Sequence, residues 1–107
     1  MIRVKFLVGN RQLMGFQISG HAGFAESGKD IICAAVSSAA YMTANTITDV
    51  IGANADAAEG DGAMTVTLNK PDERAETVLK GLELHLTELS KQYPENIKII
   101  YGGVKNA

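Results

Sequence analysis

The stretch from residue 30 to residue 52, DIICAAVSSAAYMTANTITDVIG, decides the fold because it carries a helical pattern that needs a surface to pack on. Its apolar residues recur at steps of three and four, which is the spacing of one face of an α-helix. The face consists of Ile32, Val36, Ala39, Ala40, Thr43, Ile47, Val50 and Ile51. Asp30 suits the helix N-cap and Gly52 the helix end, so we predict one helix between them.

Alternating apolar and polar residues on both sides of this helix predict strands. Before it, residues 2–8 and 12–18 alternate around a turn signal at residues 9–10, which is the pattern of a β-hairpin. After it, residues 64–68 and 97–101 show the same alternation. The sequence therefore predicts strands on both sides of the helix, four in all.

A second helix is predicted between the last two strands. Pro71 suits the first helical position, with Asn69 before it as a possible cap. The apolar stripe of this helix is Val78, Leu79, Leu82, Leu86 and Leu89. The alanine-rich, acidic residues 53–62 are interpreted as a loop. The predicted fold is α+β with the order ββαβαβ: a two-layer α/β sandwich in which two helices lie on one face of a four-stranded mixed sheet.

Composition narrows the class of protein. The chain has 107 residues, so we expect residues 1–107 to form a single domain. Its net charge is -2, and without a basic excess we expect no direct nucleic-acid partner, although a small local basic patch is compatible with this value. There is one cysteine, which excludes an intramolecular disulfide and a multi-cysteine zinc site.

The N-terminal residues and the hydropathy of the chain bear on its location. Residues 1–6, MIRVKF, alternate charged and apolar side chains, which suits a strand better than a signal peptide. From the sequence we expect no apolar run to reach the length needed to span a bilayer. We therefore expect a cytoplasmic protein with no membrane partner.

A candidate catalytic pair lies at the start of the first helix. Cys33 follows Asp30 by three residues, which places it in the first helical turn, where the helix dipole favours a thiolate and backbone N–H groups can stabilise an oxyanion. Gly20, a candidate supporting residue, opens a glycine-rich loop that carries His21. An imidazole can take the thiol proton and return it to a leaving amine, so Cys33 is the candidate nucleophile and His21 its base.

Two further residues are candidates for supporting or substrate-binding roles. Asp30 either orients His21 or only caps the helix. Ser37 lies four residues after Cys33 and so on the same helix face, where it could bond a substrate, the histidine or a backbone carbonyl.

Other interpretations of these residues stay open. A lone cysteine in a small domain is often a buried apolar residue, or Cys33 could be a redox sensor that needs an external thiol. A third alternative is a non-catalytic binding module. His85 lies within reach of the second helix's apolar stripe and is interpreted as structural. The segment 59–62, EGDG, lacks the spacing of a metal loop and is interpreted as a solvated turn.

The segments 20–22, GHA, and 30–37, DIICAAVS, resemble the signature of the ribosomal-processing cysteine proteases of bacteria. The resemblance covers essentially the whole chain and implies a cysteine endopeptidase without a cofactor or metal. It implies a Cys33–His21 dyad, with Asp30 and Ser37 at further positions of the motif. The implied substrate is the precursor of large-subunit ribosomal protein twenty-seven, cut between an aromatic and a small residue, and the implied assembly is a homodimer. Under this resemblance, the non-catalytic alternative is a ribosome-associated binding module.

The sequence does not identify the pocket that would receive the aromatic residue. Phe24, Tyr41 and Met42 are candidates because they lie near the motif in the sequence.

Overall fold

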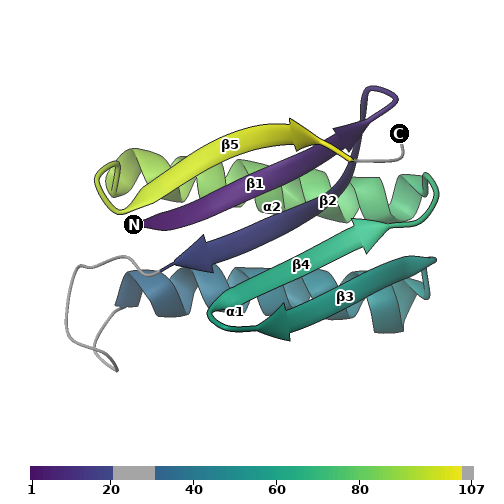
Figure 1. The fold of residues 1–107 in the computed structure, drawn as a ribbon, viewed down its shortest axis with the longest axis horizontal. Coiled ribbons are helices and arrows are strands. Elements are labelled where there is room, and N and C mark those ends of the chain that lie inside the picture. The colour runs from purple at the N-terminus through teal and green to yellow at the C-terminus, as the bar shows by residue number, and fades with distance from the viewer. Residues whose placement is uncertain (21–30, 105–107) are drawn as a thin grey trace.

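The computed structural model describes residues 1–20 and 31–104, and it shows a mixed sheet with both helices packed on one of its faces (Figure 1). Three of the candidate residues, His21, Phe24 and Asp30, lie outside this part of the chain. The elements are β1 Ile2–Gly9, β2 Gln12–Gly20, α1 Ile31–Asn45, the π-helical turn η1 Thr46–Ile51, β3 Ala55–Gly60, β4 Ala63–Leu68, α2 Glu73–Gln92 and β5 Ile97–Gly103.

The sheet has five strands in the order β3-β4-β2-β1-β5. β1 pairs antiparallel with β2 and parallel with β5, while β4 pairs antiparallel with both β2 and β3. The parallel pair forms because α2 carries the chain from one edge region of the sheet to the other before β5 begins. The predicted mixed sheet with two helices on one face is therefore confirmed.

The predicted number of strands was wrong, because residues 55–60 form an additional edge strand, β3, where a loop was expected. This strand reads ADAAEG, which lacks the β-branched and aromatic residues typical of strands, and most of it is exposed. A two-residue turn creates the pairing: Asp61 and Gly62 have φ values of 52° and 75°, as in the turns that favour hairpins. The order is consequently ββαββαβ.

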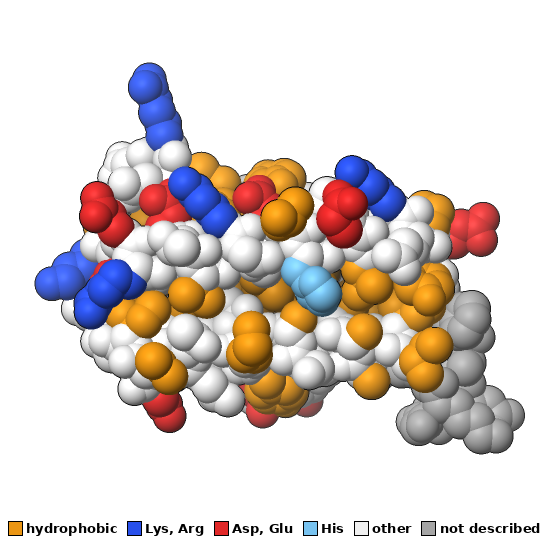
Figure 2. Space-filling view, turned by 180° about the vertical axis from the view of Figure 1, so that it is seen from behind, with side chains coloured by type: hydrophobic (Ala, Val, Ile, Leu, Met, Phe, Trp, Pro, Cys, Tyr) orange, Lys and Arg blue, Asp and Glu red, His pale blue; other side chains and the backbone are white. Residues whose placement is uncertain are grey.

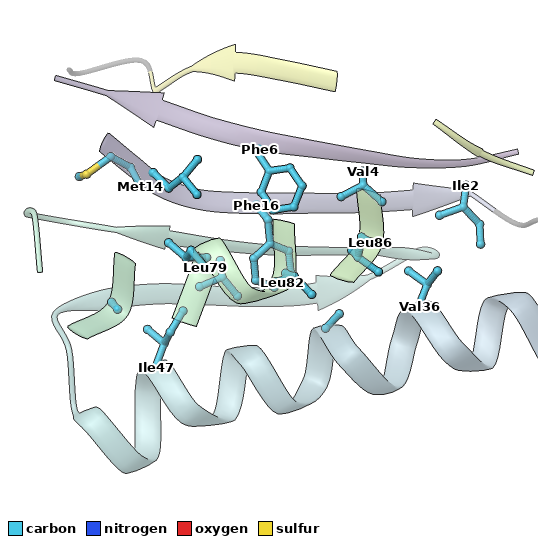
Figure 3. Packing of buried hydrophobic residues seen from close by; sticks show 14 of the residues in the cluster. Ile2, Val4, Phe6, Met14, Phe16, Val36, Ile47, Leu79, Leu82 and Leu86 are labelled. Carbon is cyan, nitrogen blue, oxygen red and sulfur yellow. The ribbon is translucent and has the colours of Figure 1, made fainter. Parts of the chain in front are cut away.

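The core lies between the sheet and the two helices (Figure 3). Phe6 and Phe16 are fully buried at its centre. They are directly paired across the adjacent strands β1 and β2. The helices cover them with apolar side chains that have almost no exposed surface. These are Ile32, Val36, Ala40 and Ile47 from α1 and η1, and Ala75, Leu79, Leu82 and Leu86 from α2.

The first helix ends where the sequence predicts, whereas the second begins two residues later than predicted. The first predicted helix changes to π-type hydrogen bonding at Thr46 and ends, as expected, at Gly52, whose φ of 70° is left-handed. The second helix begins at Glu73, and its cap is Asp72, whose side chain accepts hydrogen bonds from the backbone N–H groups of Arg74 and Ala75. Asn69, the predicted cap, instead donates through its side-chain amide to that of Asn54.

The expectation that no apolar run is long enough to span a bilayer was wrong, because the helix from Ile31 to Ile51 reaches that length. These 21 residues have a mean hydropathy of 1.3 over their most apolar window, which meets the length and composition of a membrane span. The reason is the absence of charged residues before Asp49. A core helix meets the same criteria, and one face of this helix packs on the sheet.

A hydrogen bond on the surface ties β5 to α2. The Tyr101 hydroxyl donates to the Glu83 carboxylate over 2.6 Å, and the Tyr101 ring lies 5.9 Å from the ring of Phe6. Because ionisation of the phenol would break this bond and place two anions together, the contact with Glu83 raises the pKa of Tyr101 to about 12. The contact links the C-terminal strand to the helix beneath it.

Gly15 in β2 is a position where we predict that a side chain cannot be accommodated. A Cβ atom there would lie 2.1 Å from the carbonyl oxygen of Val66, and φ is 158°. We expect Gly15→Ala to lower the free energy of unfolding by about 1–3 kcal/mol, measured by urea denaturation. Gly81, in α2, has nothing within 4 Å of its ideal Cβ. The control Gly81→Ala should therefore stabilise the protein by roughly 0.5–1 kcal/mol, and equal effects at both positions would contradict a steric clash at Gly15.

Candidate functional site

A cavity of about 300 Å³ lies between residues 33–41 of α1 and one end of the sheet. Its wall is mostly apolar, and Cys33 is part of it. The lining residues are Ile2, Ile18, Gly20, Cys33, Val36, Ser37, Ala40, Tyr41, Glu59, Gly60, Gly62, Ala63 and Met64. A volume of this size is at the lower end of the range for small-ligand sites, so it suits one or two side chains of a peptide.

The rotation of α1 about its own axis brings Cys33 to this cavity. Ile32, Val36 and Ala40 are each 1% exposed and anchor the helix on the sheet. The residue after each of these is turned by about 100° around the helix. Cys33 and Ser37 therefore form a row with Tyr41 along the cavity wall.

Cys33 is the third residue of α1 and is half-buried. A side chain in the first helical turn lies close to the positive end of the helix dipole, which stabilises a thiolate relative to a thiol. The partial burial leaves one side of the side chain in contact with the core and the other facing the cavity. The placement predicted for Cys33 in the first turn is confirmed.

Ser37 lies one turn further along the same wall and is exposed. Its hydroxyl makes no hydrogen bond to any other residue in the described ranges, whereas Thr43, Thr46 and Thr48 each donate to the carbonyl four residues earlier. Bonding to a backbone carbonyl, one of the interpretations of Ser37, is therefore not what the structure shows. The hydroxyl is available to a molecule in the cavity.

The opposite wall comes from the ends of strands that are distant in the sequence. Ile2 and Gly20 are directly paired across β1 and β2 at the edge of the cavity. A Cβ atom on Gly20 would lie 2.3 Å from the carbonyl oxygen of Met1, and its φ of 88° favours glycine. Gly20 thus allows the end of β2 to approach the N-terminus closely beside the cavity.

The β3–β4 hairpin closes the far end of the cavity. Glu59 and Met64 pair across the two strands, and both line the cavity. The Tyr41 hydroxyl donates a hydrogen bond to the Glu59 carboxylate, which joins α1 directly to the edge strand. This contact between side chains fixes the hairpin against the helix.

The structure brings together some of the predicted residues and not others. Cys33, Ser37 and Gly20 share the cavity, and Tyr41 does so as one of the candidates for the aromatic pocket. Met42, another of these candidates, does not line this cavity and is 68% exposed. The expectations for His21, Asp30 and Phe24 concern residues outside the described part of the chain.

Sequence reasoning missed most of the cavity wall. Ile18 and Met64 are apolar strand residues whose patterns indicate only that they face the helices. Glu59 was assigned to a solvated turn, although the Asp61-Gly62 dipeptide is a hairpin signal that could have placed it beside the strand it pairs with. No local signal shows that this hairpin reaches α1.

Elsewhere in the described part of the chain, we find no comparable site with a cysteine beside a cavity. A second cavity of about 580 Å³ at the other end of the sheet is larger, but the described residues that line it include Lys5 and Asp56 and neither a cysteine nor a histidine. Within residues 1–20 and 31–104, no three His, Cys, Asp or Glu side chains are grouped as metal ligands would be. His85, interpreted from the sequence as structural, is exposed on α2.

Comparison with known proteins identifies the family. A family model described as cysteine protease Prp matches residues 1–98, so the chain belongs to this family and is a cysteine protease. A curated relative, the ribosomal processing cysteine protease Prp of Bacillus subtilis strain 168, is 22% identical over 97 residues, which cover 84% of this chain and 87% of the relative.

Solved structures show the same fold. The essential ribosomal processing protease Prp from S. aureus, in complex with a covalently linked product peptide, has a TM-score of 0.87 and 25% identity, covering 95% of this chain and all of that one. SMU.848 from Streptococcus mutans has a TM-score of 0.76 and 27% identity, covering 97% of this chain and 96% of that one. The shared fold therefore extends over nearly the whole length of both chains in each comparison.

The position of Ser37 on the cavity wall predicts how access to Cys33 can be blocked. Ser37 and Ser38 are both exposed on α1, but only Ser37 lines the cavity. We expect Ser37→Leu to slow alkylation of Cys33 by a bulky maleimide by about tenfold, because the larger side chain fills the space beside the sulfur. Ser38→Leu should leave the rate unchanged. Alkylation is followed by mass spectrometry, and equal rates for the two variants would show that the cavity is not the route to the thiol.

Proposed function

We propose that this protein removes the short N-terminal extension from the precursor of large-subunit ribosomal protein twenty-seven. The cut falls between an aromatic residue and a small residue. The names of the B. subtilis and S. aureus relatives support ribosomal protein processing, and the peptide held by the S. aureus protein supports a peptide substrate. We also propose that the protein acts in the cytoplasm, where its ribosomal protein substrate is made.

One observation carries this proposal: Cys33 opens onto a mostly apolar cavity from the first turn of α1. Ile2, Ile18 and Met64 provide apolar surface opposite the thiol. Such a lining favours an aromatic side chain over a charged one, because transfer of the ring from water is favourable and no buried polar group is left unpaired. An aromatic residue held there places its own carbonyl carbon within reach of the sulfur.

The mechanism follows from thiol chemistry. His21, assigned by the family motif, takes the proton of the Cys33 thiol, and the thiolate attacks the carbonyl carbon of the aromatic residue. The positive end of α1 stabilises the negative charge that develops on the carbonyl oxygen. The peptide C–N bond breaks as His21 returns the proton to the amine. A thioester remains, which water hydrolyses to release the carboxylate and regenerate the thiol.

The supporting residues have narrower roles in this scheme. Asp30 accepts a hydrogen bond from His21 or caps the helix, and Ser37 donates to the bound peptide. The chemistry requires neither a metal nor an organic cofactor, because the nucleophile, the base and the oxyanion donors are all protein groups.

The test of the proposed function uses a synthetic peptide with a Phe-Phe-Ala junction. Wild type should cut it once, before the alanine. Cys33→Ala should lower kcat/KM by at least roughly 10³-fold because no nucleophile remains. Cleavage is measured by mass spectrometry, with the full-length precursor as a second substrate and thermal unfolding as the control for folding. If folded Cys33→Ala still cleaves the peptide, the assignment of Cys33 as the nucleophile is wrong.

We also propose that two copies of the chain associate, as the family resemblance suggests. Figure 2 shows charged side chains gathered over α2, whereas the surface over α1 is largely hydrophobic or uncharged. α1 contains no charged residue, and Ile31 and Met42, three turns apart on one side of it, are 65% and 68% exposed. An uncharged helix face with large exposed apolar residues is typical of a surface covered by a partner.

The oligomeric state tests this association. Met42 on α1 and Leu84 on α2 have nearly equal exposed fractions, 68% and 65%. We expect Met42→Glu to raise the dimer dissociation constant by about tenfold or more, because it places a charge in an apolar interface, while Leu84→Glu leaves it unchanged. Light scattering across a concentration series measures both. A wild-type chain that stays monomeric at high concentration would contradict the proposal.

A further inference from the structure

Glu59 is the only charged residue among the described residues that line the Cys33 cavity. It is the second-last residue of β3, and its pairing with Met64 sets its side chain on the helix-facing side of the hairpin. It is exposed to solvent, so its carboxylate stands at the rim of the cavity and not in the apolar interior. The rim is therefore the place where the cavity can distinguish peptides by charge.

The carboxylate of Glu59 is held by a hydrogen bond, and no ion pair to it is found among the described residues. Tyr41 donates its hydroxyl to one carboxylate oxygen, Oε2. In the described ranges the ion pairs join Arg74 to Asp72 and Lys91 to Glu88, and none involves Glu59. The second oxygen of an oriented, unpaired carboxylate is an acceptor for a cationic donor such as a lysine ammonium or an arginine guanidinium.

The spacing of Cys33 and Tyr41 along α1 gives an approximate distance from the reacting sulfur to the carboxylate that Tyr41 holds. Tyr41, which holds Glu59, lies eight residues after Cys33 on the same wall of the cavity. At a rise of about 1.5 Å per residue, the two positions are about 12 Å apart along the helix axis. An extended peptide advances roughly 3.3 Å per residue, so it covers this distance in about three to four residues.

We infer that Glu59, oriented by Tyr41, determines specificity by binding a basic residue of the peptide about three to four residues from the scissile bond. This inference rests on the proposed function, since it assigns part of the same peptide-binding site. Cys33 and the apolar wall select the residue at the cut, and Glu59 selects a positive charge further along the chain. Because the carboxylate is exposed, its effect is modest and sensitive to salt.

A lysine scan tests the inference. In a peptide with one Phe-Phe-Ala junction, Lys or Gln is placed in turn at each position within five residues of the scissile bond, except at Phe-Phe-Ala itself. Positions are counted from the scissile bond. For wild type we expect the Lys peptide to exceed the Gln peptide in kcat/KM by about two- to fivefold at the third or fourth position on one side. The ratio should approach one in about 1 M salt, where the Debye length is about 3 Å.

Two variants separate Glu59 from the general charge of the hairpin. Glu59→Gln keeps an acceptor for Tyr41 but removes the charge, so the Lys-to-Gln ratio should fall to one. Asp61 is an exposed neighbour in the β3–β4 turn that does not line the cavity. Asp61→Asn removes the same charge and should keep the ratio. A ratio retained in Glu59→Gln, or lost equally in Asp61→Asn, would overturn the inference.

The scan also distinguishes failure of this inference from failure of the proposed function. Cleavage of every peptide without any positional effect of lysine overturns only the role of Glu59. If no peptide is cleaved, the same Lys and Gln peptides, labelled with a fluorophore, are titrated against Cys33→Ala and Cys33→Ala/Glu59→Gln. Tighter binding of one Lys peptide that is lost in the double variant supports the role of Glu59, and identical binding of all peptides overturns it.

Discussion

The packing of α1 on the sheet is the constraint on which the candidate site depends. Ile32, Val36 and Ala40 are almost completely buried, and together they fix the rotation of the helix about its axis. Once that rotation is set, the next residue round the helix can point in only one direction. Cys33 and Ser37 face the cavity for this reason, and a change of rotation by one residue would turn them into the core or into solvent.

The remaining wall of the cavity depends on strands arranged by long-range pairing. β1 and β2 contribute their ends, and the β3–β4 hairpin contributes its turn region. An edge strand made mostly of alanine and acidic residues has little apolar surface with which to hold itself in place. The hydrogen bond from Tyr41 to Glu59 supplies an anchor to α1, so one contact both positions the hairpin and leaves an oriented carboxylate at the rim.

The helix and the sheet contribute different parts of the candidate peptide-cleaving site. Helix α1 provides the thiol, the partial charge that favours its ionised form and the uncharged outer surface. The sheet provides apolar surface for a peptide side chain. Membership of the cysteine protease Prp family agrees with this division. The larger cavity at the opposite end of the sheet shows that volume alone does not identify this site, because no cysteine is among the described residues that line it.

The sequence by itself determined the features that depend on local spacing. Three- and four-residue periodicity revealed α1, and the short distance from Asp30 to Cys33 placed the thiol in the first turn. Only the tertiary structure decided the fifth strand and the cavity wall that includes Glu59. The physical reason is that helix periodicity is a property of neighbouring residues, whereas a weak edge strand and a cavity form only when strands distant in sequence pair and pack against a helix.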